Sequence, residues 1–442
     1  MELLNDWAFT AAAFIFVLGV LIFIHELGHH LMAKALGIRV EAFSLGFGPR
    51  LFGFRMGETD YRVSLLPLGG YVKMAGENVV DELTGAPYEF LSKPRWQRFL
   101  VAIAGPAMNI GLAVVLMTGL YLVGINVPEY LSQPAQIGFV APDSAAEQAG
   151  LQKGDVILSV DGVQTPTWER ANLQVITNGG KLVPIRYRRD GQVNEELVEI
   201  QAVGPSEQGT LGIAPHLDFK VSEVSPGSPA DEAGLQSGDE IVQARVGGVT
   251  ADNFSAIQYM ISNQEAGTPI DFTVQRDGQS LEMTIAPYAD PEEPRRVVIG
   301  AKPVVPTELR QYSLAGSAQE AVRRNVEVAG LLFKILGQIV TGDTSLRTLS
   351  GPLEIANFSS MAAREGPSTL INFMAFISLQ LGILNLLPIP ILDGGVILLL
   401  AIEGLRGRDL SVEVKERILQ AGFLFLVLLM GFVIINDITK QL

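Results

Sequence analysis

Residues 7–29 read WAFTAAAFIFVLGVLIFIHELGH, and the organisation of the whole chain can be worked out from this stretch. Its first part, 7–24, carries no charge and is long enough to cross about 30 Å of hydrocarbon as a helix. A cleaved signal peptide would begin with basic residues, but Glu2 and Asp6 are acidic. The polar motif that ends the stretch follows without a break. We therefore predict a retained transmembrane helix over residues 1–30.

Three more uncharged stretches occur later in the chain, at 99–128, 367–392 and 418–436. Each has about 18 residues or more, so they predict further transmembrane helices over 98–125, 367–393 and 417–437. The third stretch contains Pro388 and Pro390, which predict that its helix ends or breaks near Leu387.

The composition agrees with a membrane protein. Of the 442 residues, 48% are hydrophobic and only 18% are charged, against roughly 25% charged residues in soluble chains. The formal net charge of -15 argues against nucleic-acid binding. The absence of cysteine excludes disulfides, thiol nucleophiles and cysteine-bound metals.

Basic residues mark one side of the predicted membrane region. They occur in the loop 31–97 and between the third and fourth spans, and are Lys34, Arg39, Lys93, Arg95, Arg406, Arg408, Lys415 and Arg417. By the positive-inside rule the loops 31–97 and 394–416 are cytoplasmic, so both termini and the long middle region lie outside. That region, 125–310, holds 13 basic and 26 acidic residues, which predicts a separate water-soluble part.

The middle region contains a repeat. Residues 142–155 read PDSAAEQAGLQKGD and residues 226–239 read PGSPADEAGLQSGD, at a spacing of 84 residues. A period of this length predicts two tandem domains, at 126–215 and 216–305. The shared AGLxxGD core resembles the circularly permuted PDZ domain of bacterial proteases. The resemblance implies a groove that binds peptide segments by strand addition. The alternative is a pair of domains that act only by their bulk.

His25, Glu26 and His29 form an HExxH motif. On a helix, residues four apart lie on one face, so the two imidazoles can bind one zinc ion while Glu26 lies beside the metal-bound water. Glu26 is then the acid–base residue of a hydrolysis. Ionisable groups directly after an uncharged helix are costly in a membrane, which favours a functional site over a polar helix cap. We predict that His30 is solvated or supports the site, and that His216 lies on the surface.

A hydrolytic zinc site needs a third protein ligand and one open position. Because the chain has no cysteine and no other histidine suited to the site, that ligand must be a carboxylate. The first and third predicted spans cross in the same direction, so Asp393, at the end of the third, is predicted to meet His25 and His29. An ordinary Asp-Gly turn is the alternative for Asp393, and cobalt or iron are alternatives for the metal.

These motifs together resemble the site-2 protease family of intramembrane metalloproteases. The resemblance is carried by HExxH after the first span, NLLPIPILDG at 385–394, the PDZ-like repeats between them, and Gly105-Pro106 with Asn109 at the start of the second span. It covers almost the whole chain. The predicted fold is a multi-domain membrane protein with four transmembrane α-helices, a membrane-associated β-hairpin or sheet, and two tandem circularly permuted PDZ domains (α+β) outside the membrane.

The resemblance implies an intramembrane zinc endopeptidase in a bacterial inner membrane, with the repeats and both termini periplasmic. Zinc would be bound by His25, His29 and Asp393, with Glu26 as the catalytic residue and Asn385 near the scissile peptide. The implied substrate is a single-pass anti-sigma factor already trimmed on its outer side, in a stress response, and also remnant signal peptides. Peptides at the PDZ domains and the lipid bilayer would be the other partners.

The loop 31–97 is predicted to contain strands. Strand-like segments at 43–54 and 61–66 flank a turn at 56–59, and 68–74 is a candidate further strand. We expect this sheet to enter the cytoplasmic leaflet and to pair by an edge with the unwound substrate; the alternative is an ordinary interfacial hairpin. The predicted substrate contacts, in the sheet and near the end of the third span, are Gly46, Gly48, Leu65, Asn385 and Pro388.

Residues 306–366 are predicted to be an amphipathic helix and linker. Apolar residues recur at helical spacing over 319–340, which indicates a helix that lies on the outer membrane surface or packs on the protein.

Two other functions stay open: a non-enzymatic PDZ scaffold with a degenerate metal site, and a metal transporter. Chelator-sensitive cleavage of a transmembrane substrate separates the enzyme from the scaffold, and metal flux in proteoliposomes identifies a transporter.

Overall fold

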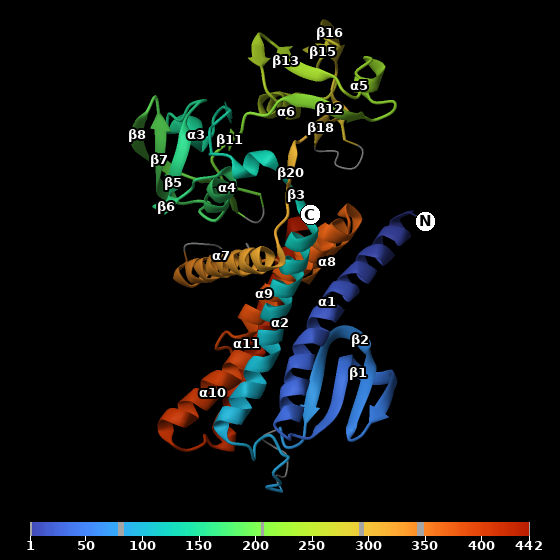
Figure 1. Cartoon of the computed structure of the whole chain (residues 1–442), viewed down its shortest axis with the longest axis vertical. Helices are drawn as coiled ribbons and strands as arrows, with labels where there is room; N and C mark the ends of the chain where they lie inside the picture. The colour runs from blue at the N-terminus through green and yellow to red at the C-terminus, as the bar shows by residue number, and fades with distance from the viewer. Residues whose placement is uncertain (1, 78–83, 205–206, 291–295, 343–348, 442) are drawn as a thin grey trace. The chain divides into compact units, whose positions relative to one another are not determined.

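The computed structural model describes residues 2–77, 84–204, 207–290, 296–342 and 349–441 (Figure 1). The chain forms two compact units. One comprises Met1–Ile125 and Arg310–Leu442, and we call it the helical unit. The other comprises Asn126–Leu309, and we call it the middle unit.

Four helices in the described part of the helical unit are long and apolar enough to cross a membrane, as the sequence predicts. They are α1 (Glu2–Ala35), α2 (Arg95–Val123), α9 (Pro367–Asn385) and α11 (Val412–Gln441). The shortest, with 19 residues, is about 28 Å long at the helical rise of about 1.5 Å per residue. α2 packs against both α1 and α9, so it is the central helix of the unit (Figure 1).

The end of the third span differs from the prediction. α9 ends at Asn385, close to the expected break, and not at 393. Asp393 is instead the first residue of another helix, α10 (Asp393–Arg406), so the predicted loop 394–416 is wrong over most of its length. The cause can be read in the segment itself. An acidic residue in the first turn and Arg406 in the last suit the helix dipole, and Gly407 at φ +70° ends the helix in the left-handed conformation.

The predicted strands form one sheet from two long bent strands, β1 (Val40–Met56) and β2 (Thr59–Met74). Phe43 lies opposite both Tyr61 and Val72, and Phe54 also lies opposite Tyr61. The backbone therefore makes four antiparallel segments in the order 70–74, 40–47, 59–66 and 50–56. Segment 70–74, which we call the edge segment, pairs on one side only among the described residues. The candidate strand at 68–74 is thus the end of β2.

His30 joins this sheet to α1, and the prediction that it is solvated is wrong. Its side chain is buried, and its Nε2 lies 3.1 Å from the hydroxyl of Tyr61. The imidazole also packs edge-on against the rings of Phe43 and Tyr61. Because His30 faces a different direction from His25 and His29, the same helical turn can bind the sheet with one side and present the HExxH motif with the other.

Two further helices occupy the segment predicted as an amphipathic helix and linker: α7 (Leu314–Thr341) and α8 (Pro352–Glu365). On α7, Ala321 and Asn325 are buried while Val322, Val326 and Phe333 are exposed. The helix packs against α2 with its buried face. Its exposed apolar side chains are typical of a helix that also contacts lipid.

The middle unit contains two copies of one element order, in which a short helix, a strand hairpin, a longer helix and a second hairpin follow an opening strand. The first copy comprises β4 (Phe139–Val140), α3 (Ala145–Gln148), β5 (Val156–Val160), β6 (Val163–Gln164), α4 (Trp168–Ile176), β7 (Leu182–Arg189), β8 (Gln192–Glu199), β9 (Gln201–Val203), β10 (Gln208–Thr210) and β11 (Ile213–Ala214). The second comprises β12 (Phe219–Val224), α5 (Pro229–Glu232), β13 (Glu240–Val246), β14 (Val249–Ala251), α6 (Phe254–Ser262), β15 (Ile270–Arg276), β16 (Gln279–Ile285), β17 (Tyr288–Ala289), β18 (Val297–Val298) and β19 (Ala301–Pro303). Outside the copies, β3 (Ile125–Pro128) pairs with β20 (Thr307–Arg310), and η1 (Glu129–Ser132) is a single 3-10 turn.

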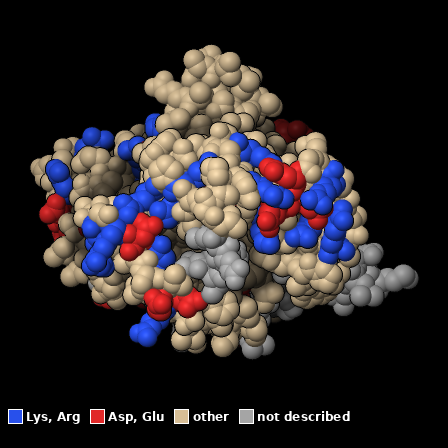
Figure 2. All heavy atoms as spheres, turned by 90° about the horizontal axis from the view of Figure 1, so that it is seen from below, with Lys and Arg blue, Asp and Glu red and all other residues tan. Residues whose placement is uncertain are grey.

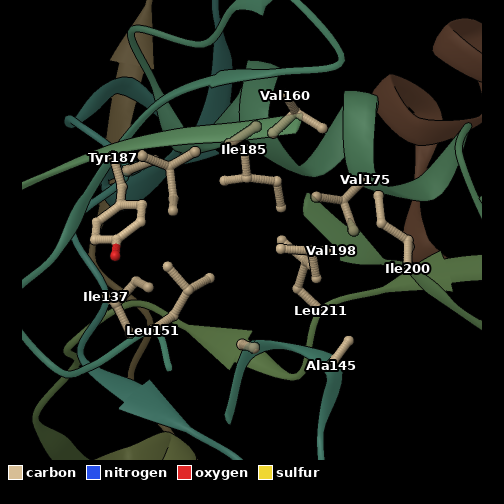
Figure 3. Packing of buried hydrophobic residues seen from close by; sticks show 14 of the residues in the cluster. Ile137, Ala145, Leu151, Val160, Val175, Ile185, Tyr187, Val198, Ile200 and Leu211 are labelled. Carbon is tan, nitrogen blue, oxygen red and sulfur yellow. The ribbon is translucent and has the colours of Figure 1, made fainter. Parts of the chain in front are cut away.

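Each copy has its own hydrophobic core. In the first, Leu151 of the AGLxxGD motif packs among Ile137, Ile185, Tyr187 and Leu211 (Figure 3). In the second, Leu235 occupies the equivalent place in a separate cluster. The sequence repeat therefore corresponds to two domains with the same order of elements.

The aspartate that closes each motif is buried and ion-paired. Asp155 accepts two hydrogen bonds from the guanidinium of Arg189, and Asp239 accepts two from Arg276. Arg189 also donates to the carbonyl of Gly150, and Arg276 to that of Gly234. Both of these motif glycines are in the left-handed conformation. Arg276 holds the pKa of Asp239 below its usual range. The contribution of this pair to stability is therefore present above the unfolded-state pKa of about 4 and is lost as pH falls further.

Candidate metal centre

His25, His29 and Asp393 meet in the helical unit, although Asp393 lies 364 positions after His29 in the chain. The Nε2 atoms of His25 and His29 are 3.2 Å apart. Oδ2 of Asp393 lies 3.1 Å from Nε2 of His25, and its Oδ1 lies 3.3 Å from Nε2 of His29. Two ligands of a tetrahedral zinc with bonds of about 2.0–2.1 Å are about 3.3 Å apart, so these spacings fit zinc. Three protein ligands leave the fourth position open for water.

Both imidazoles are held by the central helix α2. Nδ1 of His29 lies 2.8 Å from the carbonyl oxygen of Val101, which fixes that nitrogen as the donor and leaves Nε2 free for a metal. Nδ1 of His25 lies 3.4 Å from the side-chain amide of Asn109. Asn109 is buried and its Oδ1 has no partner among the described residues. An amide flip would place this oxygen to accept from Nδ1–H of His25, as the outer partners of metal ligands usually do.

Gly105 and Asn109 lie against the imidazoles of His25 and His29, and reasoning from the sequence alone did not assign them to the site. A Cβ at position 105 would collide with Nε2 of His29 and would lie 2.9 Å from Cε1 of His25. The glycine therefore lets both imidazoles approach α2. The available signal was the Gly105-Pro106 pair with Asn109 in an otherwise apolar helix, which contributed to the family resemblance but did not reveal what these residues contact.

We expect Gly105→Ala to weaken zinc binding at least about tenfold, because the new methyl group displaces both imidazoles; changes around metal ligands typically cost 10- to 100-fold in affinity. Zinc content of the purified protein at buffered free zinc measures the effect. Gly111→Ala is the matched control on the same helix, since a Cβ there meets no atom within 4 Å. Equal zinc affinity in the two variants would contradict this account of Gly105.

The segment that brings Asp393 to the imidazoles is a tight turn between α9 and α10. Ile391 lies at φ +84°, which costs a β-branched residue about 1–3 kcal/mol. Gly394 and Gly395 lie so close to the carbonyls of Leu387 and Ile389 that a side chain on either would collide with them. The turn therefore depends on its residue types, and it fixes where Asp393 enters α10.

A cavity of about 580 Å³ opens beside the three ligands. Glu26 lines it together with His25, His29 and Asp393, and Asn385 contributes from the end of α9. The edge segment forms another wall, through Gly70, Tyr71, Val72 and Met74. Four of the predicted substrate contacts do not line this cavity: Gly46, Gly48, Leu65 and Pro388. Their contact with substrate stays a prediction. His216 is exposed, as predicted.

Beyond the metal ligands the cavity reaches a cluster of buried charges. Glu403 of α10 accepts hydrogen bonds from Lys415 at 2.7 Å and from the backbone N–H of Leu410 at 3.0 Å. Arg98 of α2 lies 3.9 Å from the other oxygen of Glu403. These contacts compensate the buried charges and connect α2, α10 and α11. Figure 2 views the molecule from this end and shows lysine and arginine side chains gathered among a few acidic ones.

The chain was compared with protein families and known proteins. The model described as peptidase family M50 matches residues 13–429. "Protease RseP" of Yersinia pestis is 35% identical over 453 residues, which cover 98% of this chain and 98% of that protein. "Regulator of sigma-E protease RseP" of Escherichia coli (strain K12) is 35% identical over 452 residues, covering 97% and 98%.

Two further comparisons bear on the metal and on the repeats. A protein of Pasteurella multocida (strain Pm70) whose name includes the words "zinc metalloprotease" is 32% identical over 456 residues, covering 98% of this chain and 99% of that protein. The match to the solved PDZ domain of an SdrC-like protein from Listeria monocytogenes covers 20% of this chain and 92% of that chain, with 20% identity and a TM-score of 0.17. That score is too low to bear on the fold of the repeats.

Proposed function

Because the chain belongs to peptidase family M50 and is a zinc metalloprotease, we propose that it cleaves the transmembrane segment of single-pass membrane proteins. The observation that carries the proposal is the meeting of His25, His29 and Asp393 beside Glu26, in a cavity walled by helices long enough to span a membrane. A catalytic centre so placed acts on a peptide that has entered the bilayer. A non-enzymatic scaffold does not need this set of groups.

Glu26 is the acid–base residue in this proposal. Zinc, when bound, supplies a Lewis acid that polarises the scissile carbonyl and acidifies the attacking water. Glu26 lies on the same turn of α1 as the two histidines and lines the same cavity, so its carboxylate takes a proton from the water and passes it to the leaving amine. The amide of Asn385, in the cavity wall, holds the backbone of the substrate.

The edge segment gives an unwound substrate somewhere to bind. A transmembrane helix satisfies its own backbone, and each polar group freed by unwinding costs several kcal/mol in lipid. Segment 70–74 borders the cavity and offers backbone donors and acceptors on its unpaired side. We propose that the substrate adds to this edge as a strand and thereby brings one peptide bond to the metal centre.

We expect Val72→Pro to lower kcat/KM at least about tenfold without loss of zinc, because proline removes an edge N–H and cannot take a partner strand there. Cleavage of a transmembrane substrate and zinc content are measured together. Leu51→Pro is the control. Leu51 lies in segment 50–56, at the opposite edge of the sheet, and has no paired residue on the neighbouring segment among the described residues. Full cleavage by Val72→Pro would exclude pairing at this edge.

The substrate class follows from the relatives and from the architecture. The relatives from Yersinia pestis and Escherichia coli are both named RseP, the second as "Regulator of sigma-E protease RseP". We therefore propose an anti-sigma factor, trimmed on its outer side, as the substrate, with remnant signal peptides as a further group. We propose that the protein lies in a bacterial inner membrane with both termini and the middle unit periplasmic. The tandem PDZ-like domains then act in one of two ways: they exclude substrates whose outer part is too large, or they bind the end of the substrate's outer part.

The direct test uses the purified chain in proteoliposomes with a single-pass anti-sigma-type substrate in two forms, one with its outer domain and one without. The proposal requires cleavage inside the membrane segment of the trimmed form, its loss on chelation, and its return with zinc. Cutting outside the membrane segment would contradict intramembrane cleavage. Equal cutting of both forms would contradict the filter role of the middle unit. Metal flux into the vesicles would support a transporter instead.

A further inference from the structure

Glu77 is a cavity residue to which the proposed mechanism gives no part. It follows the edge segment after a tight turn, and it lines the metal cavity together with Glu26 and Asp393. No lysine, arginine or histidine forms an ion pair with it among the described residues. Its Oε2 instead accepts a hydrogen bond of 3.1 Å from the backbone N–H of Met74. Burial raises the pKa of Glu77 to about 7, so an ionised carboxylate is held there at a cost.

The Met74 N–H belongs to the unpaired side of the edge segment. In an antiparallel strand, alternate residues point their N–H and C=O groups to the same side. The N–H of Ala75 bonds inward, to the carbonyl of Arg39 in the turn before β1. The N–H groups of Val72 and Met74 point the other way, toward the cavity, and the Met74 N–H donates to the carboxylate of Glu77.

The last outward donor of the edge is therefore occupied by a carboxylate. A peptide that adds to the edge as a strand brings backbone carbonyl oxygens to the outward N–H groups, that of Met74 included. The carboxylate of Glu77 and a substrate carbonyl cannot bond the single Met74 N–H at full strength together. An edge donor capped by a side chain is also protected from pairing with the wrong strand.

We propose that Glu77 is an intramolecular substitute for the substrate backbone: it caps the edge at Met74 in the free enzyme, and a substrate carbonyl must displace it to bind. The contact is thus a built-in competitive inhibitor of strand addition. The ligand class that displaces it is an unwound, extended peptide with a free carbonyl at that register, and a segment that stays helical cannot do so. This inference rests on the edge pairing proposed above and adds to it a residue that opposes binding.

The test is the KM of the full-length enzyme for the trimmed transmembrane substrate. Glu77→Ala removes the competing acceptor, so KM should fall about fivefold, the equivalent of about one net hydrogen bond, with zinc content equal to wild type. Glu77→Gln keeps a weaker, neutral acceptor and should give an intermediate KM. Glu41→Ala is the control, because this carboxylate pairs with Lys73 on the same sheet and does not line the cavity. Its KM should match wild type.

Amide hydrogen exchange gives a second readout that does not depend on turnover. In the free Glu77→Ala enzyme the Met74 amide should exchange faster than in wild type, while the Ala75 amide, bonded inward, should not change. An unchanged or higher KM in Glu77→Ala, or loss of its zinc, would overturn the proposal. If Val72→Pro cleaves normally, edge pairing itself is wrong. If Val72→Pro is inactive and Glu77→Ala leaves KM unchanged, only the capping role of Glu77 is wrong.

Discussion

Glu26→Gln should reduce kcat at least about a hundredfold while the protein keeps a full equivalent of zinc. General acid–base catalysis contributes about 10²- to 10⁴-fold in enzymes, and an amide can neither take a proton from water nor return one to the leaving amine. The zinc ligands are unchanged, because they are the two imidazoles of α1 and the carboxylate of Asp393. Single-turnover cleavage of the trimmed transmembrane substrate and metal analysis of the same sample measure the two quantities.

Glu58→Gln is a matched control for this variant. It makes the same chemical change on the hairpin turn of the sheet, where Glu58 is half-exposed and pairs with Lys34. Wild-type turnover is expected for it. Zinc loss in Glu26→Gln would mean that Glu26 supports the metal centre and is not the catalytic base. Substantial activity with zinc in place would mean that another group takes the proton.

Local patterns in the sequence predict the parts of the site that lie within one helix. The spacing of His25 and His29 is a property of α1 alone, and the uncharged run before them identifies the helix as a membrane span. Asp393 could be predicted as a ligand only because the first and third spans cross the membrane in the same direction, so that their C-terminal ends lie at the same face. The prediction located it at the end of a helix, whereas it begins one, since two prolines end α9 and the pattern of α10 is that of a separate helix.

Residues that act through long-range contacts could not be found in this way. Asn109 and Gly105 contact the imidazoles from a different helix, and nothing in their own neighbourhood shows which face of α2 meets α1. Glu77 matters because of the sheet edge beside it, and a strand pattern does not reveal which strand is at the edge.

The repeat shows the same limit. The motif aspartates recur at 84 residues, but their partners Arg189 and Arg276 are 87 residues apart, because the second copy has three more residues between the aspartate and the arginine. A fixed register therefore finds the motif and misses the ion pair. The two arginines correspond by their place in the fold: each lies at the end of the strand, β7 or β15, that pairs with the strand following the motif, β5 or β13.

Asp393→Asn should lower zinc affinity at least about a hundredfold and remove activity at low free zinc. The carboxylate is the only anionic ligand of the three, and a neutral amide oxygen is a weaker ligand for a divalent cation. The fold should persist, because the negative charge at the start of α10 contributes only about 0.3–1 kcal/mol through the helix dipole. Zinc titration against a competing chelator measures the affinity, and circular dichroism checks the helices.

Asp409→Asn separates loss of a ligand from loss of a surface charge. Asp409 follows α10 in the same unit, is half-exposed and pairs with Arg95, so its variant should bind zinc like wild type. High zinc should restore part of the activity of Asp393→Asn, because His25 and His29 remain and Glu26 is intact. Wild-type zinc affinity in Asp393→Asn would be the damaging result. It would mean that the convergence of α1 and α10 does not form the metal centre, and the proposed catalytic site would lose its basis.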